Sequence, residues 1–277
     1  MRPDQALTIY ELRALNDEAL KIFDQPGKLL ELGSNLAGLH WEADFAFVFF
    51  TGTPEPMVAD FLYAHPSLDL KHIHHLTYAQ WQDGAGAEPL VVAGLTFTHP
   101  ARPAAGPQIL IDPGLAFGFG GHPTTLACLG FLARAAHSVP APSTALDLGS
   151  GTGILSLAAA AWGLARVVGV DYSHLAVEAA LDNLRLNHLK DRVSFFRGPA
   201  QNYARHPAEI LMANLHLSLQ EELFALGAFQ NRRFVIASGL LPSEGEYLIE
   251  KLKSINLKLI DLIRTDRWIS LFMEKAD

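Results

Sequence analysis

The feature that most constrains this chain is a glycine-rich turn between an apolar run and a helix-like segment. It reads Asp147-Leu148-Gly149-Ser150-Gly151-Thr152-Gly153, and the apolar run before it covers 145–148. Glycines let the backbone turn tightly and approach a ligand without an intervening Cβ. The N–H groups exposed where a helix begins favour a carboxylate or a phosphate. We therefore expect a strand-turn-helix unit that holds a ligand.

The segments after this turn predict the fold class. From Thr144 onward, strand-like and helix-like segments alternate regularly, which is typical of a doubly wound, mostly parallel Rossmann-like sheet in the α/β class. The last two strands, expected at 257–263 and 268–273, are joined by a short turn. They are therefore predicted to form an antiparallel hairpin, because parallel pairs need a long crossover.

Three segments describe the domain organisation that we expect. Residues 1–105 read as a small α+β domain, 106–143 as a glycine-rich loop with a linker helix, and 144–277 as the catalytic domain. The sequence of the first domain predicts the order β-α-β-α-β, including a helix after Asn16. Further strands are expected at 90–97 and 108–111.

Composition and charge exclude several classes of protein. Hydrophobic residues make up 49% of the 277 residues and charged residues 18%, as in globular proteins. The longest apolar run, 153–165, is shorter than the ~20 residues of a membrane-spanning helix. The charged N-terminus does not resemble a secretory signal. The single cysteine, Cys128, cannot form an internal disulfide, so we expect a cytoplasmic protein. The short apolar runs lead us to expect no membrane partner.

The negative charge is concentrated in the first part of the chain. Residues 1–105 hold six Lys and Arg against thirteen Asp and Glu, a net charge of −7, whereas the rest of the chain has a net charge of −1. Such a module repels nucleic acid and attracts a basic partner. The alternative is ordinary surface solubility.

The residues around the glycine turn indicate which ligand it holds. A dinucleotide fingerprint needs Gly or Ala at the sixth position from Gly149, where this chain has Ile154. Asp171 ends the next strand, 22 residues after Gly149, where a carboxylate accepts the ribose hydroxyls of a nucleotide. Asp147 suits the cationic ammonium or sulfonium of S-adenosylmethionine better than a pyrophosphate. The pattern favours a methyltransferase, and the alternative is a structural turn with a capping aspartate.

Two further segments belong to the expected site. The loop from Asp112 to Thr125 contains four glycines within 114–121 and would close over the ligand, or else form an interdomain hinge. Asn214 follows the fourth strand of the sheet, where it either faces the reacting end of the cofactor or caps the next turn. No Pro-Pro pair follows it, unlike in methyltransferases for planar amides or bases. An sp³ amine is therefore the better acceptor.

These motifs together resemble the PrmA family of ribosomal protein L11 methyltransferases. The similarity lies in the loop D-P-G-L-A-F-G-F-G-G-H-P-T-T, the turn L-D-L-G-S-G-T-G-I-L, the strand V-V-G-V-D and the segment A-N-L, in that order over 108–216. The final strands, around 267–271, also resemble the family, and coverage reaches back to about Trp81. Before that, the resemblance is architectural.

The resemblance implies an activity, a cofactor and a partner. The family transfers methyl groups from S-adenosylmethionine to lysine side chains and the N-terminal amine of a large-subunit ribosomal protein. The N-terminal domain would recognise this basic substrate, without direct contact to nucleic acid. Asn214 is the expected catalytic residue, and the expected cofactor contacts are Phe117, Gly118, Thr125, Asp147, Gly149, Gly151, Gly153, Asp171 and Asn214.

Three departures from the family pattern bear on the substrate. Phe119 replaces a threonine in F-G-T-G, Ser173 stands where a second acid is expected, and Leu215-His216 follow the asparagine in place of Ile-Leu. The alternatives are therefore a methyltransferase of another protein or a small amine, a non-catalytic cofactor-binding module, and a nicotinamide oxidoreductase that Ile154 disfavours.

Three other histidines give weaker signals. His72 and His74 share one face of a predicted strand and are a possible metal pair, but no third ligand is evident in the sequence. We therefore expect surface histidines and no metal. His122 either touches the acceptor or cofactor or holds the loop.

Overall fold

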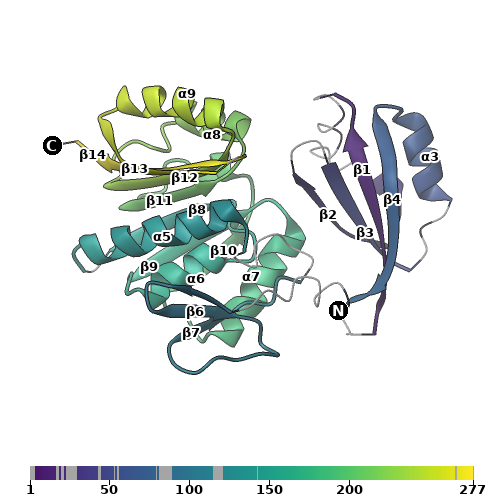
Figure 1. Ribbon diagram of the computed structural model, residues 1–277, viewed down its shortest axis with the longest axis horizontal. Coiled ribbons are helices and arrows are strands. Elements are labelled where there is room, and N and C mark those ends of the chain that lie inside the picture. The colour runs from purple at the N-terminus through teal and green to yellow at the C-terminus, as the bar shows by residue number, and fades with distance from the viewer. Residues whose placement is uncertain are drawn as a thin grey trace. The chain divides into compact units, whose positions relative to one another are not determined.

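The computed structural model divides into two compact units, Met1–Gly86 and Ala87–Asp277 (Figure 1). The residues that the structure describes are 4–16, 19, 22, 30–42, 45–52, 54, 56–78, 80, 89–114, 121–141, 143–265 and 267–276.

The first unit is a four-stranded antiparallel sheet with a helix on one face. Its strands lie in the order β2-β3-β1-β4. The aromatic and β-branched residues of β3 suit a buried strand, and Val48 and Phe50 pack with Phe61 of the helix. The elements are β1 (Ala6–Ala14), the 3₁₀ turn η1 (Leu30–Leu32), β2 (Leu36–Glu42), β3 (Phe45–Thr51), α3 (Met57–Ala64) and β4 (Leu68–Thr77).

The second unit is built on a seven-stranded sheet in the order β10-β9-β8-β11-β12-β14-β13. The first five strands of that order are parallel, and β14 pairs antiparallel with both β12 and β13. This confirms the doubly wound sheet and its C-terminal hairpin. The strands are β8 (Thr144–Leu148), β9 (Arg166–Asp171), β10 (Val193–Arg197), β11 (Ile210–Asn214), β12 (Phe234–Leu240), β13 (Leu257–Arg264) and β14 (Ile269–Lys275).

Helices cover both faces of this sheet (Figure 1). In β8, Ala145 belongs to the core shared with α5, α6 and α7, whereas Leu146 and Leu148 belong to the core shared with α8 and α9. The strand is buried on both sides, as a parallel strand should be. The helices are α5 (Pro123–Ser138), α6 (Ile154–Ala161), α7 (His174–Leu186), the 3₁₀ turn η2 (Ala200–Tyr203), α8 (Leu217–Ala225) and α9 (Pro242–Lys253).

A small three-stranded sheet precedes the large one. Its strands are β5 (Leu90–Val92), β6 (Leu95–Thr98) and β7 (Gln108–Leu110). A single strand was expected over 90–97, but Ala93 and Gly94 have φ of 46° and 78° and form a tight turn between antiparallel β5 and β6. Two successive residues with positive φ are typical of a two-residue hairpin.

The domain boundaries also differ from those expected. The sequence placed a boundary at 105, whereas the units divide after Gly86, because Phe97 and Ile109 share the core of α5 and α6. The helix α5 lies in that core and is more than a linker. Strand β2 was not expected in the first unit. The helix predicted after Asn16 falls mostly outside the described residues.

Two asparagines, one within α7 and one at its C-terminal cap, connect this small sheet to the glycine turn. Asn183 is fully buried, and its Oδ1 accepts a hydrogen bond from Asp112 N at 2.8 Å. Its Nδ2 lies 3.0 Å from both Asp112 O and Thr152 O. One turn later, Asn187 makes the same pair of bonds to the N and O of Leu110. The start of the Asp112 loop is thus fixed next to the glycine turn.

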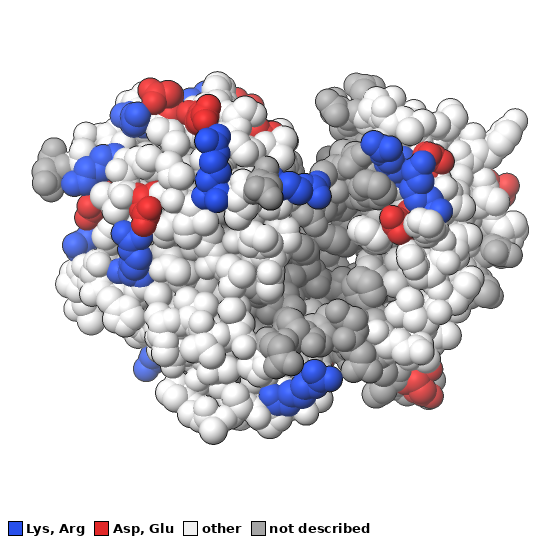
Figure 2. All heavy atoms as spheres, in the orientation of Figure 1, with Lys and Arg blue, Asp and Glu red and all other residues white. Residues whose placement is uncertain are grey.

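Within the described ranges, no helix has both the length and the apolar character needed to cross a membrane. On the face shown in Figure 2, acidic and basic side chains are interspersed over the second unit and do not gather into one basic patch.

We expect Asn183→Ala to lower the free energy of unfolding by about 1.5–4.5 kcal/mol, because three hydrogen bonds to backbone groups are lost at ~0.5–1.5 kcal/mol each. Urea unfolding of the whole protein measures this. Asn202→Ala, at an exposed asparagine in η2, is the matched control. A loss no larger than that of the control would contradict the role given to Asn183.

Candidate active site

The glycine turn lies between β8 and α6, at the carboxyl edge of the sheet. Gly149, Gly151 and Gly153 all have positive φ, of 77°, 53° and 81°. A Cβ on Gly149 would lie 2.4 Å from Leu215 Cδ2, and one on Gly153 would lie 2.5 Å from Phe195 Cζ. Both backbone conformation and space therefore require glycine at these positions. The missing Cβ atoms thus make room for Leu215 and Phe195 to pack against the turn.

Asp171 closes this turn from the neighbouring strand. It is the last residue of β9, and its Oδ2 accepts a hydrogen bond from Gly151 N at 2.9 Å, while its Oδ1 accepts one from Ser173 N at 2.9 Å. Burial raises the pKa of Asp171, and the N–H groups of Gly151 and Ser173 oppose that rise. The Tyr172 N–H opposes the rise as well. A carboxylate has about four acceptor positions, so Asp171 keeps acceptor capacity for a further donor.

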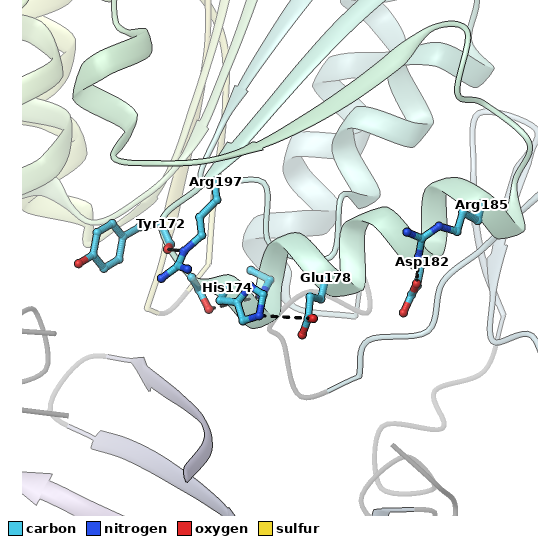
Figure 3. Close-up of polar contacts among 8 residues, drawn as sticks. Tyr172, His174, Glu178, Asp182, Arg185 and Arg197 are labelled. Carbon is cyan, nitrogen blue, oxygen red and sulfur yellow. Dashed lines mark hydrogen bonds and ion pairs between the residues drawn. The ribbon is translucent and has the colours of Figure 1, made fainter. Parts of the chain in front are cut away.

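The segment after Asp171 leads into α7 and is exposed (Figure 3). Ser173 caps the helix by accepting a hydrogen bond from Ala176 N, so the residue that replaces the expected second acid has a structural role. The Tyr172 side chain is 51% exposed. Arg197 Nε, from the end of β10, donates to Tyr172 O at 3.4 Å. This bond joins the ends of β9 and β10 beside the carboxylate.

Charged pairs continue along the outer side of α7. His174 and Glu178 lie 3.4 Å apart at i,i+4 spacing, and Arg185 contacts Asp182 one turn further on (Figure 3). All four side chains are more than half exposed, so these pairs contribute little to stability. The carboxylates of these pairs are engaged on the surface of α7, whereas Asp171 bonds the glycine turn.

Asp147 lies beneath the turn in the core. It is 1% exposed, and its Oδ2 accepts a hydrogen bond from Ser156 Oγ of α6 at 2.6 Å. Burial raises the pKa of Asp147 to about 7, against the opposing effect of the Ser156 hydrogen bond. The second oxygen, Oδ1, has no partner among the described atoms, and neither does the buried hydroxyl of Ser150 in the turn. The strand therefore holds a buried carboxyl group with one unused acceptor next to the turn.

Asn214 ends β11 and contacts the start of α5. Its Nδ2 donates to Thr124 Oγ1 at 3.2 Å, and this hydroxyl lies 2.7 Å from His122 Nδ1. His122 caps α5 by accepting from Thr124 N, and its ring packs edge-on against Trp268 at 5.4 Å. Because Thr124 binds the amide nitrogen, the carboxamide oxygen of Asn214 points elsewhere. It is an acceptor whose orientation is set by its neighbour.

Strand order brings most of the predicted site residues together. Asp147 lies near the end of β8 and the glycines follow that strand. Strand β8 lies between β9 with Asp171 and β11 with Asn214. The carboxyl ends of three adjacent parallel strands therefore carry these residues, at the edge where such sheets bind ligands.

Comparisons with known proteins identify the family. The sequence matches the family "Ribosomal protein L11 methyltransferase (PrmA)" over residues 81–276, which is more than half of the chain. The chain therefore belongs to the PrmA family. The match covers nearly all of the second unit and leaves most of the first unit outside it.

Two relatives from bacteria illustrate the similarity. Over 179 residues, the chain is 36% identical to a ribosomal protein L11 methyltransferase of Geotalea daltonii, covering 59% of this chain and 56% of the relative. Over 170 residues, it is 32% identical to that of Bacillus cytotoxicus, covering 61% and 54%. The chain thus spans about half the length of the curated relatives that it matches.

A solved structure supports the fold. The crystal structure of a ribosomal protein L11 methylase from Lactobacillus delbrueckii subsp. bulgaricus has a TM-score of 0.57 and 24% sequence identity. It covers 67% of this chain and 95% of that structure. At this identity the likeness concerns the fold, and it agrees with the Rossmann-like architecture seen here.

The structure places the other predicted site residues of this PrmA chain as follows. Thr125 is buried on α5, but the hydroxyl that contacts Asn214 belongs to Thr124, which the sequence did not single out. His216, and not Asn214, caps the next helix, α8. Phe117, Gly118 and Phe119 lie outside the described residues. The cofactor contacts themselves stay predictions.

A surface hollow on this PrmA chain lies at the other edge of the sheet, where β12 begins. It is lined by Arg232, Asn256 and Lys275 among others. The Arg232 guanidinium is buried and donates to the carbonyls of Ala204, His206, Ala208 and Ala228. This side chain therefore holds the fold together, and the hollow is unrelated to the carboxyl edge.

We expect Asp147→Asn to reduce the pH dependence of stability. The pKa of Asp147 is raised to about 7 in the folded protein, so the group favours folding most below its unfolded pKa of ~3.9, and this contribution is lost as pH rises towards 7. The loss amounts to about 1.4 kcal/mol per pH unit between those limits. Relative to the natural protein, the variant should gain stability as pH rises from 5 to ~7.

Urea unfolding at several pH values measures this difference. Asp191→Asn, at an exposed carboxylate, removes the same charge and is the control. If the stability curves of Asp147→Asn and the natural protein run parallel to each other, Asp147 does not carry this pH dependence.

Proposed function

We propose that this PrmA chain transfers a methyl group from S-adenosylmethionine to an amine of a basic ribosomal protein, of the kind named in its relatives, L11. The observation that carries the proposal is the arrangement of the glycine turn, Asp171 and Asn214 on three adjacent strand ends. A lysine side chain or an N-terminal amine is the acceptor that we infer.

The residues at the carboxyl edge fit this cofactor. Asp171 keeps acceptor capacity beyond its bonds to Gly151 and Ser173, and a carboxylate at this strand end suits the ribose hydroxyls. The glycines of the turn let the backbone lie against the amino acid part of the cofactor. The unpartnered Oδ1 of Asp147 and hydroxyl of Ser150 are buried polar atoms that a ligand, directly or through water, would satisfy.

The other expected contacts follow from the resemblance. We infer that Thr125 lies near the cofactor at the start of α5, and that Phe117 and Gly118 contribute from the loop that follows Asp112. When bound, S-adenosylmethionine supplies a methyl group activated by its positively charged sulfur. The chain then has to position the acceptor amine and exclude water, which are the usual protein contributions in such reactions.

Asn214 is the residue that we assign to the acceptor. An amine needs a lone pair to react, but a lysine with an ordinary pKa of ~10.4 is protonated at neutral pH. Removing water from around the amine lowers its pKa and favours the neutral form. The Asn214 Oδ1 can accept an N–H of that amine, because Thr124 holds the Nδ2 side of the carboxamide. The released proton passes to water.

The first unit is the candidate for substrate recognition. Residues 1–86 hold five Lys and Arg against twelve Asp and Glu, so this unit carries the whole −7 of the acidic front. Such a charge speeds the encounter with a basic protein and is screened by salt over ~8 Å at physiological ionic strength. Turnover on the ribosomal protein should therefore fall as salt rises, whereas cofactor affinity should change little.

The function is tested by supplying labelled S-adenosylmethionine with purified L11, and separately with ribosome-rich and ribosome-depleted extracts. Mass spectrometry of the labelled species should find methylated amines on L11. Asn214→Ala should lower kcat by about 10²-fold or more, as positioning effects of this kind do, with little change in cofactor affinity.

Each other outcome identifies an alternative. Label on another protein or on a small amine would replace the proposed substrate. Cofactor binding without transfer to any extract would indicate a non-catalytic binding module. Failure to bind S-adenosylmethionine would revive a nicotinamide oxidoreductase.

We expect Asp171→Ala to weaken S-adenosylmethionine binding by at least about tenfold, because each charge-assisted hydrogen bond is worth ~1.5–3 kcal/mol. Calorimetric titration of the full chain with the cofactor measures the change. Asp182→Ala, at an exposed carboxylate of α7 that contacts Arg185, is the control. Unchanged affinity in Asp171→Ala would remove this residue from the cofactor site.

A further inference from the structure

A histidine pair on the edge strand of the first unit is not used by the proposed reaction. Strand β4 is the last strand of its sheet, and its sequence contains His72-Ile73-His74. Residues two apart on a strand point to the same face, so the two imidazoles lie side by side. Both residues are exposed. They are therefore accessible to a ligand from solvent.

The neighbouring strand adds a carboxylate that the sequence did not reveal. In the antiparallel pairing of β1 with β4, Glu11 lies directly opposite His72. Its Oε2 is 3.0 Å from Nε2 of His74, the diagonal neighbour. The Glu11 side chain is 19% exposed and that of His74 is 44% exposed. Glu11 and the two histidines thus come together on one face of the sheet, although 61 positions separate Glu11 from His72 in the sequence.

This hydrogen bond fixes which nitrogen of His74 can bind a metal. An ionised carboxylate only accepts hydrogen bonds, so Nε2 of His74 donates its hydrogen to Glu11. The other nitrogen, Nδ1, then carries the lone pair in the neutral ring. A histidine that ligates a metal through one nitrogen commonly donates the other N–H to a carboxylate. Glu11 therefore prepares His74 as a ligand.

The separation of the two rings suits a shared cation. The ring centroids of His72 and His74 are 5.9 Å apart, with an interplanar angle of 51°. Two imidazoles that bind one zinc ion at 2.0–2.1 Å have centroids about 5–6 Å apart at a tetrahedral or slightly wider angle. The nearest basic side chain in the sequence, Lys71, is ion-paired with Asp69. Its charge is thereby offset next to the site.

We propose that His72 and His74 chelate a divalent first-row transition cation, with zinc as the probe, and that Glu11 orients His74 from behind. No three His, Cys, Asp or Glu side chains within the described parts of the chain are already arranged around a metal position. The site is accordingly a two-imidazole chelate. Its remaining coordination positions go to water or to a donor atom of a bound protein. Imidazole ligands favour copper, nickel and zinc over magnesium or calcium.

The test is calorimetric titration of the full chain with zinc chloride near neutral pH. We expect one zinc ion per chain, and a loss of affinity of at least about tenfold in either His72→Gln or His74→Gln, because a single imidazole no longer chelates. Glu11→Gln should weaken binding by about 10–100-fold, as loss of an orienting carboxylate does.

His75→Gln is the matched control, because His75 lies on the same strand but faces the other way, with its Nδ1 3.4 Å from Thr8 Oγ1. It should bind zinc as the natural protein does. A zinc-dependent rise in melting temperature, present in the control and absent in His72→Gln, gives a second readout.

Three results would overturn the proposal. The first is no zinc binding by the natural protein. The second is unchanged affinity in His72→Gln or His74→Gln. The third is a loss in His75→Gln as large as that in the other two variants. Unchanged affinity in Glu11→Gln would overturn the role of Glu11. Methyl transfer is measured separately, so failure of this site leaves the proposed function untouched.

Discussion

The buried carboxamide of Asn183 is the interaction on which the rest of the second unit depends. It bonds both backbone groups of Asp112 and the carbonyl of Thr152, so one side chain of α7 joins the loop that follows β7 to the glycine turn. A carboxamide suits this position because it donates and accepts at once, as a peptide group does. Without it, three backbone groups would each lose a hydrogen bond.

Single side-chain hydrogen bonds hold the site at several other points. Asp171 bonds Gly151 across two strands, Asp147 bonds Ser156 beneath the turn, and Asn214 bonds Thr124 from the next strand. Each bond joins the end of a strand to the turn before a helix or to the first residues of a helix. The polar groups are therefore oriented before a ligand arrives. Such preorganisation reduces what a ligand must lose on binding.

The two units carry different properties of the protein. The second unit contains the family match and the carboxyl-edge site, whereas the first holds the acidic charge and the His72–His74 pair. Its aromatic core between sheet and helix, with Val48, Phe50 and Phe61, does not involve that charge. Surface charge and surface histidines can therefore vary without disturbing the fold, which is expected because exposed substitutions usually change stability little.

The sequence by itself determined the doubly wound sheet, the C-terminal hairpin and the position of the glycine turn. These follow from local signals in the sequence. The signals are the alternation of segments, the short final turn, and closely spaced glycines, which indicate a turn with positive φ. It also placed Asp171 and Asn214 at strand ends, because each of these polar residues follows a short apolar run.

Only the tertiary structure decided which side chains meet. The sequence did not single out Thr124, whose hydroxyl contacts Asn214 from the start of α5. The sequence predicted one strand over 90–97, because an alanine gives no signal for the positive φ that Ala93 adopts. The sequence pattern showed the two histidines but not Glu11, which lies next to them because of the antiparallel register of β1 and β4. Periodicity is a local property of the chain, whereas a hydrogen-bond partner depends on the packing of elements far apart in sequence.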